Sequence, residues 1–400
     1  MAIRLYGTIF YQKNVAGILE QVPDGRFAYT YEPNYLANGG PQIAYTLPLQ
    51  QDPHYTFGLP PFFDNLVAEG WLARAQARAL GIRGDDRFAR LLAFGVDCPG
   101  AVSVIDPRPA RAPDLTVGSG EEIAALVNRA SISGVQPKLF AVREGDSFRP
   151  AQHGESSTHI AKLPSPELDG VVEVEYLTTR AAVALLPDDQ VVNVEIAPVE
   201  KVDGPCLLVQ RFDRTAEGVK IHFEEFNQLL GRPSDAKYEG SYGEMAAFIS
   251  ANQSVQREQD IDRLFRRVLA CILLGNNDAH SKNFALLYTS DGFRLAPFYD
   301  VVAVTIFPRY KDSGMALKLG EGANPHMLSD IGRKNLLLLA HSFGLNETVL
   351  ELAVRSLRRR LRAAEAAINE SPVGSLHWKQ KLSELLRKRW NGTFDLIGRQ

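Results

Sequence analysis

Three polar residues in the second half of the chain have the types and spacing that suit phosphoryl transfer. Asp278 and Asn283 lie five positions apart in "LLGNNDAHSKNF", directly after the apolar run "VLACILLG", and Asp300 ends the run "RLAPFYD". Phosphoryl transfer from ATP needs a carboxylate at the acceptor hydroxyl and oxygen ligands that hold Mg²⁺ on the phosphates. The spacing D-x-x-x-x-N therefore predicts Asp278 as the catalytic carboxylate and Asn283 and Asp300 as Mg²⁺ ligands. The alternative is a polar helix end in which this spacing arose by chance.

Residues that suit ATP binding lie upstream of this loop. Lys162 sits in the apolar strand pattern "THIAKLP", where its charge would point inward unless it met an anion such as a phosphate; an exposed lysine on an edge strand is the alternative. Glu175 lies thirteen residues later near the start of a strong helical pattern, where it can pair with that lysine or simply favour the helix dipole. The strand "LLVQRFDR" predicts a hinge whose backbone contacts adenine, formed by Val209, Gln210, Arg211 and Phe212.

A serine-flanked turn, "ASISGVQPKLF", precedes the first strand of this region, where a protein kinase would carry G-x-G-x-x-G. Ser131, Ser133 and Gly134 can offer hydroxyls and backbone N–H groups to phosphate oxygens, although serine-glycine turns are common. His280 lies between Asp278 and Asn283 and is a general base by residue type. We interpret it instead as a residue whose hydrogen bonds hold the loop in shape.

The elements that must position these residues predict an α+β protein. Short β-type runs, among them "QIAYTLPL" at 42–49, fill the first hundred residues, helical periodicity follows, and the proline-rich segment at 106–115 indicates a linker. Strand patterns then surround one strong helix up to residue 214, and helical patterns dominate beyond residue 223. We therefore predict a small mostly-β subdomain at 1–108, a kinase-like N-lobe with an antiparallel sheet at 116–214 and a large α-helical catalytic C-lobe at 215–400.

Composition excludes several other classes of protein. Of the 400 residues, 23% are charged and 45% hydrophobic, with a net charge of −3, which is ordinary for a globular chain and gives no overall attraction to nucleic acid. Cys98, Cys206 and Cys271 have neither disulfide nor zinc spacing. We find neither a signal sequence nor a segment apolar enough to span a membrane, so we expect a cytoplasmic protein without membrane association.

The motifs together resemble a known family. "SISGVQPKL", "HIAKLP", "VQRFDR", "KYEG", "NDAHSKNF" and "APFYDV", preceded by "GLPPFFDNLVAEG", have the order and approximate spacing found in the HipA-like serine/threonine kinases, the toxins of bacterial toxin–antitoxin modules. The resemblance implies ATP and Mg²⁺ as cofactors. It assigns catalysis to Asp278, metal binding to Asn283 and Asp300, phosphate binding to Lys162 and the hinge to 209–212. It also implies autophosphorylation of Ser131, but Ser133 follows in "SIS", so either serine can be the modified one.

The same resemblance implies partners. An aminoacyl-tRNA synthetase is the expected protein substrate, and a small helix-turn-helix antitoxin is the expected partner, with operator DNA bound only through the antitoxin complex. We interpret the basic stretches "RSLRRRLR" and "LLRKRW" as solvated helix faces. Two rival hypotheses remain: a lipid or small-molecule kinase with a similar D-x-H-x-x-N loop, and a pseudokinase that acts as a repressor subunit.

Overall fold

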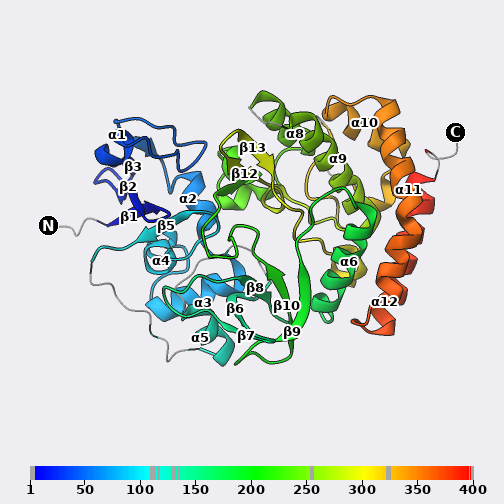
Figure 1. Ribbon diagram of the computed structural model, residues 1–400, viewed down its shortest axis with the longest axis horizontal. Helices are drawn as coiled ribbons and strands as arrows, with labels where there is room; N and C mark the ends of the chain where they lie inside the picture. Colours follow the sequence, from blue (N-terminus) through cyan, green and yellow to red (C-terminus); the bar gives the residue numbers. More distant parts are fainter. Residues whose placement is uncertain are drawn as a thin grey trace. The chain divides into compact units, whose positions relative to one another are not determined.

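The computed structural model describes residues 5–108, 114, 118–127, 132, 136–252, 256–320, 326–395 and 397 (Figure 1). The chain forms two compact units, each made of two separate stretches. The first contains Met1–Leu163 and Ala197–Ala236, and the second contains Pro164–Ile196 and Lys237–Gln400.

The first unit begins with an antiparallel sheet in the order β4-β3-β2-β1-β5. Residues alternate between its two faces, so that Ile9, Leu19 and Tyr29 share one buried core with side chains of the neighbouring helices. Asp86 caps the last of these helices by accepting a hydrogen bond from the N–H of Ala89 at 3.0 Å. The elements are β1 (Tyr6–Tyr11), β2 (Asn14–Gln21), β3 (Phe27–Tyr31), α1 (Pro33–Ala37), β4 (His54–Thr56), α2 (Pro61–Leu66), α3 (Gly70–Leu80), α4 (Arg87–Phe94) and β5 (Val102–Ile105).

The predicted strand at 42–49 is wrong, because this segment forms turns with only an isolated bridge between Ala44 and Leu47. Ile43, Ala44 and Leu47 of this segment are nevertheless buried. The hydroxyl of Tyr31 donates to the carbonyl of Leu47 at 2.6 Å and accepts from the N–H of Ile43 at 3.1 Å. The side chain of Tyr31 thus makes the hydrogen bonds that a neighbouring β-strand would otherwise make to these backbone groups.

A second sheet completes the first unit, with strands in the order β7-β6-β8-β10-β9. The pairs β6–β7, β6–β8 and β8–β10 are antiparallel, as the sequence predicted, and β8 lies between β6 and β10. Ser119 and Glu122 form a reciprocal cap at the start of the preceding helix. The elements are α5 (Gly120–Leu126), β6 (Lys138–Glu144), β7 (Ser147–Pro150), β8 (His159–Lys162), β9 (Val194–Pro198), β10 (Pro205–Gln210), β11 (Phe223–Glu225) and α7 (Phe226–Leu229).

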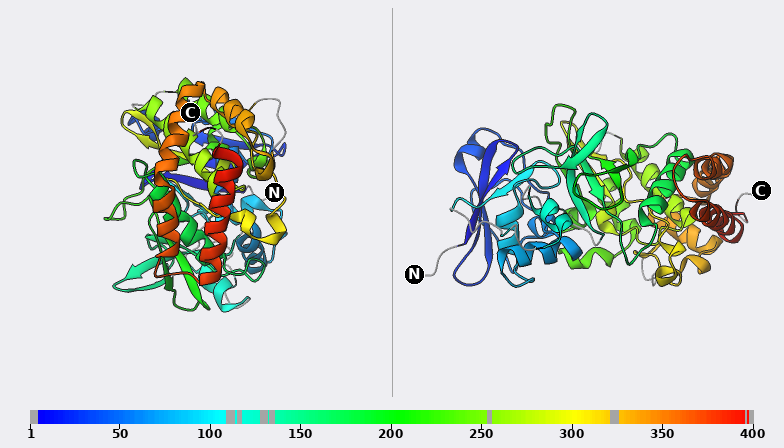
Figure 2. Two further views of the ribbon diagram at one scale, coloured as in Figure 1. Left: turned by 90° about the vertical axis from the view of Figure 1, so that its right-hand side faces the viewer. Right: turned by 90° about the horizontal axis from the view of Figure 1, so that it is seen from below.

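The second unit is mostly helical and contains α6, which we expected in the N-lobe. This helix packs against α9, α11 and α12, and α11 and α12 lie side by side in both orientations (Figure 2). Among the described residues of this unit, the paired strands β12 and β13 form a hairpin between the helices. The elements are α6 (Val171–Leu185), α8 (Tyr242–Ala251), α9 (Arg257–Leu274), β12 (Ala285–Thr289), β13 (Gly292–Leu295), α10 (Arg333–Ser342), α11 (Glu347–Asn369) and α12 (Leu376–Arg389), with a 3₁₀ turn at Ser281–Asn283.

Within the described part of the chain, no single helix is both long enough and apolar enough to cross a membrane. The pair α10 and α11 meets the length and composition criteria only when taken together, and the two helices are bent by 116° at the break between them.

Candidate active site

The predicted catalytic loop begins directly after Gly275, the residue that follows α9. Gly275 caps the helix in the left-handed conformation with φ of +77°, which favours glycine. A Cβ atom at this position would lie 2.6 Å from Thr305 Oγ1 and 2.6 Å from Leu385 Cδ2. The polar cluster that follows therefore starts at a position where both backbone conformation and packing exclude a side chain.

Hydrogen bonds fix the geometry of the loop between Asn276 and Asn283. The N–H of Asn283 donates to the carbonyl of His280 at 2.9 Å, and the N–H of His280 donates to the carbonyl of Asp278 at 2.8 Å. The side-chain Nδ2 of Asn283 also donates to the carbonyl of Asp278, at 3.0 Å. This bond commits the amide nitrogen and leaves Oδ1 of Asn283 as the side-chain atom that can bind a cation.

Asn276 connects the loop to the second predicted aspartate. Its Oδ1 accepts from the N–H of Asp278 at 3.2 Å, while its Nδ2 donates to the carbonyl of Asp300 at 3.3 Å. Asp300 itself has φ of +58°, a left-handed conformation that a non-glycine residue rarely adopts. The sequence analysis missed Asn276, although it lies in the quoted motif, because two adjacent asparagines gave no way to tell a bridging side chain from a helix cap.

The negative charge of Asp300 acts on the carboxyl group of Asp278. Burial and the negative charge of Asp300 raise the pKa of Asp278 to about 6, while the hydrogen bond from Tyr238 and the charge of Lys237 oppose this shift. Like charges that face each other in a partly buried site favour a cation between them. Mg²⁺ typically takes one or two carboxylates together with substrate phosphates, so Asn283 and Asp300 fit this ion. A closed metal cage is absent from the described residues, where no group of three or more His, Cys, Asp or Glu converges.

Helix α6 supports the segment that follows the second aspartate. The N–H of Ala303 donates to Thr178 Oγ1 at 3.3 Å, and Thr179 Oγ1 donates to the carbonyl of Val301 at 3.5 Å. Glu175 lies three and four residues before these threonines, on the same side of the helix, and is only 1% exposed. The acidic residue of the first turn is Glu173 instead. Burial thus gives Glu175 a different environment from that of a surface residue which favours the helix dipole.

In the first unit, Lys162 lies on a central strand and is only 7% exposed, which removes the alternative of an exposed edge lysine. Lys138 on β6 is directly opposite Lys162 in the antiparallel pair, so both side chains lie on the same face of the sheet. An anion bound by both would relieve the repulsion between them. Lys138 is a further candidate that the sequence analysis passed over, although it lies within the serine-loop motif.

Several residues of the predicted hinge already make contacts within the protein. Val209 and Gln210 pair with β8, and the N–H of Arg211 donates to the carbonyl of Thr158 at 3.0 Å. The guanidinium of Arg211 is buried and hydrogen-bonded to protein carboxylates. Of this residue, the backbone carbonyl is therefore the group that could contact a nucleotide. The ring of Phe212 packs against Phe223 at 5.0 Å.

The remaining predicted residues divide into two groups. Ser131, Ser133 and Gly134 lie outside the described residues, so their phosphate-binding role stays a prediction. His280 is buried, and its ring packs edge to face against Tyr238 with a centroid separation of 5.2 Å. Tyr238 itself was quoted within a motif but received no role from the sequence.

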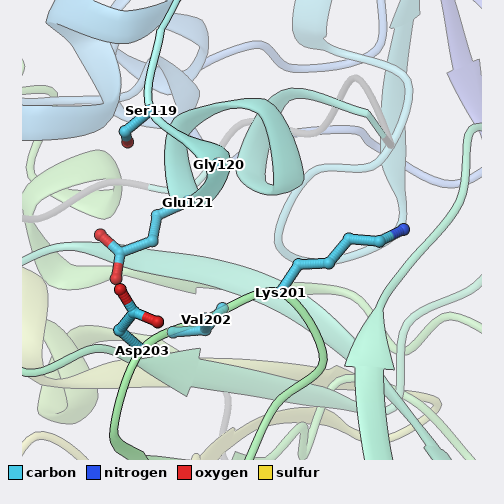
Figure 3. A pocket seen from close by; sticks show the side chains of 6 residues that line it. All are labelled: Ser119, Gly120, Glu121, Lys201, Val202 and Asp203. Atoms are coloured by element: carbon cyan, nitrogen blue, oxygen red, sulfur yellow. The ribbon is translucent and has the colours of Figure 1, made fainter.

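A hollow of about 450 Å³ in the first unit is not built from predicted site residues. It lies at the start of α5, where the carboxylates of Glu121 and Asp203 turn toward one another and Lys201 points away (Figure 3). Its lining has two acidic groups, whose negative charges do not suit ATP phosphates. The candidate active site in the second unit is therefore the catalytic loop with Asp300; the residues predicted to bind the nucleotide belong to the first unit and stay a prediction.

Comparisons with known proteins show which family the chain belongs to. Residues 7–105 match the model of the HipA N-terminal domain, and residues 130–366 match that of the HipA-like C-terminal domain. Y4dM of Sinorhizobium fredii, named as a candidate kinase, is 28% identical and covers 93% of both chains. The serine/threonine-protein kinase toxin HipA of Shewanella oneidensis is 26% identical over 86% of this chain and 84% of its own.

The fold is also that of a solved structure. A chain in the complex of Shewanella oneidensis HipA, HipB and operator DNA superposes with a TM-score of 0.79, at 23% identity, over 98% of this chain and 99% of that chain. The predicted α+β, kinase-like fold with a small β-rich N-terminal part is thereby confirmed. Because the family models match both regions of the sequence, the chain belongs to the HipA-like kinase family.

Proposed function

We propose that the protein is an ATP- and Mg²⁺-dependent serine/threonine protein kinase that acts as the toxin of a toxin–antitoxin module. The observation that carries this proposal is the loop in which Asn276 joins Asp278 to Asp300, with Oδ1 of Asn283 left available for a cation. The site has the groups that phosphoryl transfer needs: a carboxylate for the acceptor hydroxyl and oxygen ligands for Mg²⁺.

Each residue then has a chemical task. Asp278 accepts the proton of the acceptor hydroxyl and orients its oxygen; with its pKa raised to about 6, this carboxylate is mostly ionised at neutral pH while remaining a stronger base than an exposed aspartate. Asn283 and Asp300 would hold Mg²⁺, which neutralises charge on the phosphates when it is bound. Lys162 contributes positive charge for the phosphates, and the backbone at 209–212 receives the adenine.

The proposed substrate, regulation and partner rest on the family resemblance. We propose an aminoacyl-tRNA synthetase as the protein substrate, autophosphorylation at Ser131 or Ser133, and a helix-turn-helix antitoxin as partner, through which the complex binds operator DNA. The structural neighbour is a HipA that is solved together with HipB and its operator DNA, which supports a partner of this kind. Cys98, Cys206 and Cys271 are buried free cysteines.

The test is phosphate incorporation into the purified full-length protein and into purified synthetases, with Mg²⁺·ATP, followed by intact-mass measurement and phosphopeptide mapping. We expect the wild type to carry phosphate on the peptide spanning residues 131–138 and Asp278→Asn to carry none. The near-isosteric variant should keep the wild-type melting temperature. Phosphate transfer only to lipids or small alcohols, or no ATP binding by calorimetry, would contradict the proposal in favour of the two rival hypotheses.

A further inference from the structure

Tyr238 places a phenol hydroxyl against the carboxylate of Asp278. The hydroxyl donates a hydrogen bond to Oδ1 of Asp278 at 3.0 Å. A substrate hydroxyl must come within about 2.6–3.2 Å of its general base, directly or through one water, before its proton can be transferred. The hydroxyl of Tyr238 therefore makes the hydrogen bond to Asp278 that the proposed mechanism assigns to the hydroxyl of the acceptor.

The backbone beside Tyr238 is anchored to the catalytic loop, whereas its side chain is not enclosed. Ser281 Oγ donates to the carbonyl of Lys237 at 2.9 Å, and the Ser281 side chain is fully buried. The side chain of Tyr238, by contrast, is 48% exposed. Its ring packs edge to face on His280, and the ammonium of Lys237 lies 5.5 Å from the ring centre. Rotation about its side-chain bonds can therefore carry the ring into solvent without opening the core.

We propose that Tyr238 is a gate at the acceptor site, where its hydroxyl takes the place of the acceptor at Asp278 until a protein substrate displaces it. This inference rests on the proposed function, because it takes Asp278 as the catalytic carboxylate. A protein acceptor replaces one hydroxyl by another and gains further contacts along its chain. A water molecule offers the same hydrogen bond without those contacts, so the gate favours a protein acceptor over water.

The reaction that the gate suppresses is hydrolysis of ATP. In that reaction the oxygen of water bonds to the γ-phosphorus while the bond from that phosphorus to the β,γ-bridging oxygen breaks. ADP leaves with the bond's electrons, and a proton of the water passes to Asp278. Removing the hydroxyl of Tyr238 opens Asp278 to water and to a protein hydroxyl alike.

The variant Tyr238→Phe tests the gate, because it removes the hydroxyl and keeps the ring on His280. With full-length protein and Mg²⁺·ATP, the probes are ATP hydrolysis without acceptor and phosphorylation of the synthetic peptide LVNRASISGVQPK, which is residues 126–138 of this chain. One hydrogen bond contributes enough to change an equilibrium by roughly two- to tenfold. We expect hydrolysis to rise and the KM for the peptide to fall by that factor, with kcat for the peptide unchanged.

Tyr55→Phe is the matched control, since Tyr55 is 51% exposed and belongs to the other compact unit. It should leave both rates unchanged. A lower kcat with an unchanged KM in Tyr238→Phe would show that the hydroxyl orients Asp278 during transfer, and would overturn the gate. Wild-type constants in Tyr238→Phe, or phosphate mapped to Tyr238 itself, would overturn it as well. If the wild type transfers phosphate to no acceptor, including water, the proposed function fails and the gate fails with it.

Discussion

Arg211 and Asp213 bind each other through two parallel hydrogen bonds in the interior of the first unit. Nε of Arg211 donates to Oδ1 of Asp213 at 2.9 Å, and Nη2 donates to Oδ2 at 2.7 Å. Asp97 accepts from Nη1 of Arg211 at 3.1 Å and from Nη2 of Arg214 at 2.6 Å. Arg214 also binds Asp213, at 2.7 Å. This buried cluster joins Asp97, within the residues that match the N-terminal family model, to the segment after β10, within the C-terminal one.

Loss of one carboxylate from this cluster should destabilise the first unit strongly. In Asp97→Ala, both arginines stay buried and lose a charged partner, which typically costs about 3–5 kcal/mol. Urea unfolding followed by tryptophan fluorescence measures the change. The control is Asp85→Ala, because the Asp85 pair with Arg83 lies on the surface, where the two side chains are 68% and 86% exposed, and should have no measurable effect. Equal stability of the two variants would contradict this account.

The buried ring of His222 should make the protein sensitive to mild acid. Its Nδ1 accepts from the N–H of Ala101 at 3.4 Å and its Nε2–H donates to the carbonyl of Ile43 at 3.0 Å, an arrangement that requires the neutral ring. Burial lowers the pKa of His222 to about 4, whereas the unfolded chain takes up a proton near 6.5. Because the unfolded state binds the proton first, stability falls as pH decreases from 6.5 to about 4, by about 3 kcal/mol in total.

The measurement is the free energy of unfolding at several pH values for wild type and His222→Gln. The glutamine cannot take up the proton, so its stability should fall less between pH 6.5 and 4, even if it starts lower. His159, whose pKa burial also lowers to about 4, keeps part of the acid dependence in both proteins. Identical slopes for wild type and His222→Gln would show that His222 is not responsible.

Asp300→Asn should weaken nucleotide binding in a way that depends on Mg²⁺. The substitution keeps the shape of the side chain and removes the charge proposed to hold the ion. Even residues that only orient metal ligands change metal affinity by about 10–100-fold, so we expect at least a tenfold loss of ATP affinity at low Mg²⁺ and partial recovery at high Mg²⁺. Calorimetric titrations at several Mg²⁺ concentrations, with the exposed Asp291→Asn as control, decide this. An affinity loss that is constant across Mg²⁺ concentrations would exclude a direct ligand role.

Thr178→Val should affect both stability and nucleotide binding, because Thr178 connects α6 to the segment after Asp300. Valine has the same shape but cannot accept from the N–H of Ala303, and a buried donor without a partner costs about 1–3 kcal/mol. Thr179→Val is the matched comparison, since its bond to Val301 is long, at 3.5 Å, and its loss should matter less. Thermal unfolding and ATP titration of both variants give the order of effects; the reverse order would be inconsistent with these contacts.

The sequence predicted those parts of the site that lie within one short motif. Asp278, His280 and Asn283 share one loop, so their spacing alone limits how far apart they can be. Tyr238 reaches Asp278 from forty positions away, and no local pattern indicates that its hydroxyl turns toward that carboxylate. Thr178 and Thr179 were equally hidden, because buried threonines on a helix look like ordinary packing until their partners are known.

The fold was predicted correctly where hydrophobic periodicity determines the secondary structure. It was predicted wrongly where a side chain, instead of a neighbouring strand, makes the hydrogen bonds to the backbone. The alternating pattern of β1 to β3 and the antiparallel sheet around Lys162 could be expected from residue types. The segment at 42–49 has the same apolar content, yet Tyr31 satisfies its backbone and leaves it irregular. Helix α6 was predicted as a helix, but its packing against α9, α11 and α12 could not be predicted, because sequence does not show which distant helices will cover its apolar residues.

The placement of α6 constrains the order in which this chain can fold during synthesis. The helix ends at Leu185, but α11, against which it packs, begins only at Glu347. At a translation rate of about 5–20 residues per second, α6 leaves the ribosome on the order of ten to thirty seconds before this partner. A nascent or truncated chain that lacks α11 therefore has no finished support for the segment carrying Asp300. The packing that holds α6 beneath this segment is thus completed only after most of the polypeptide has been made.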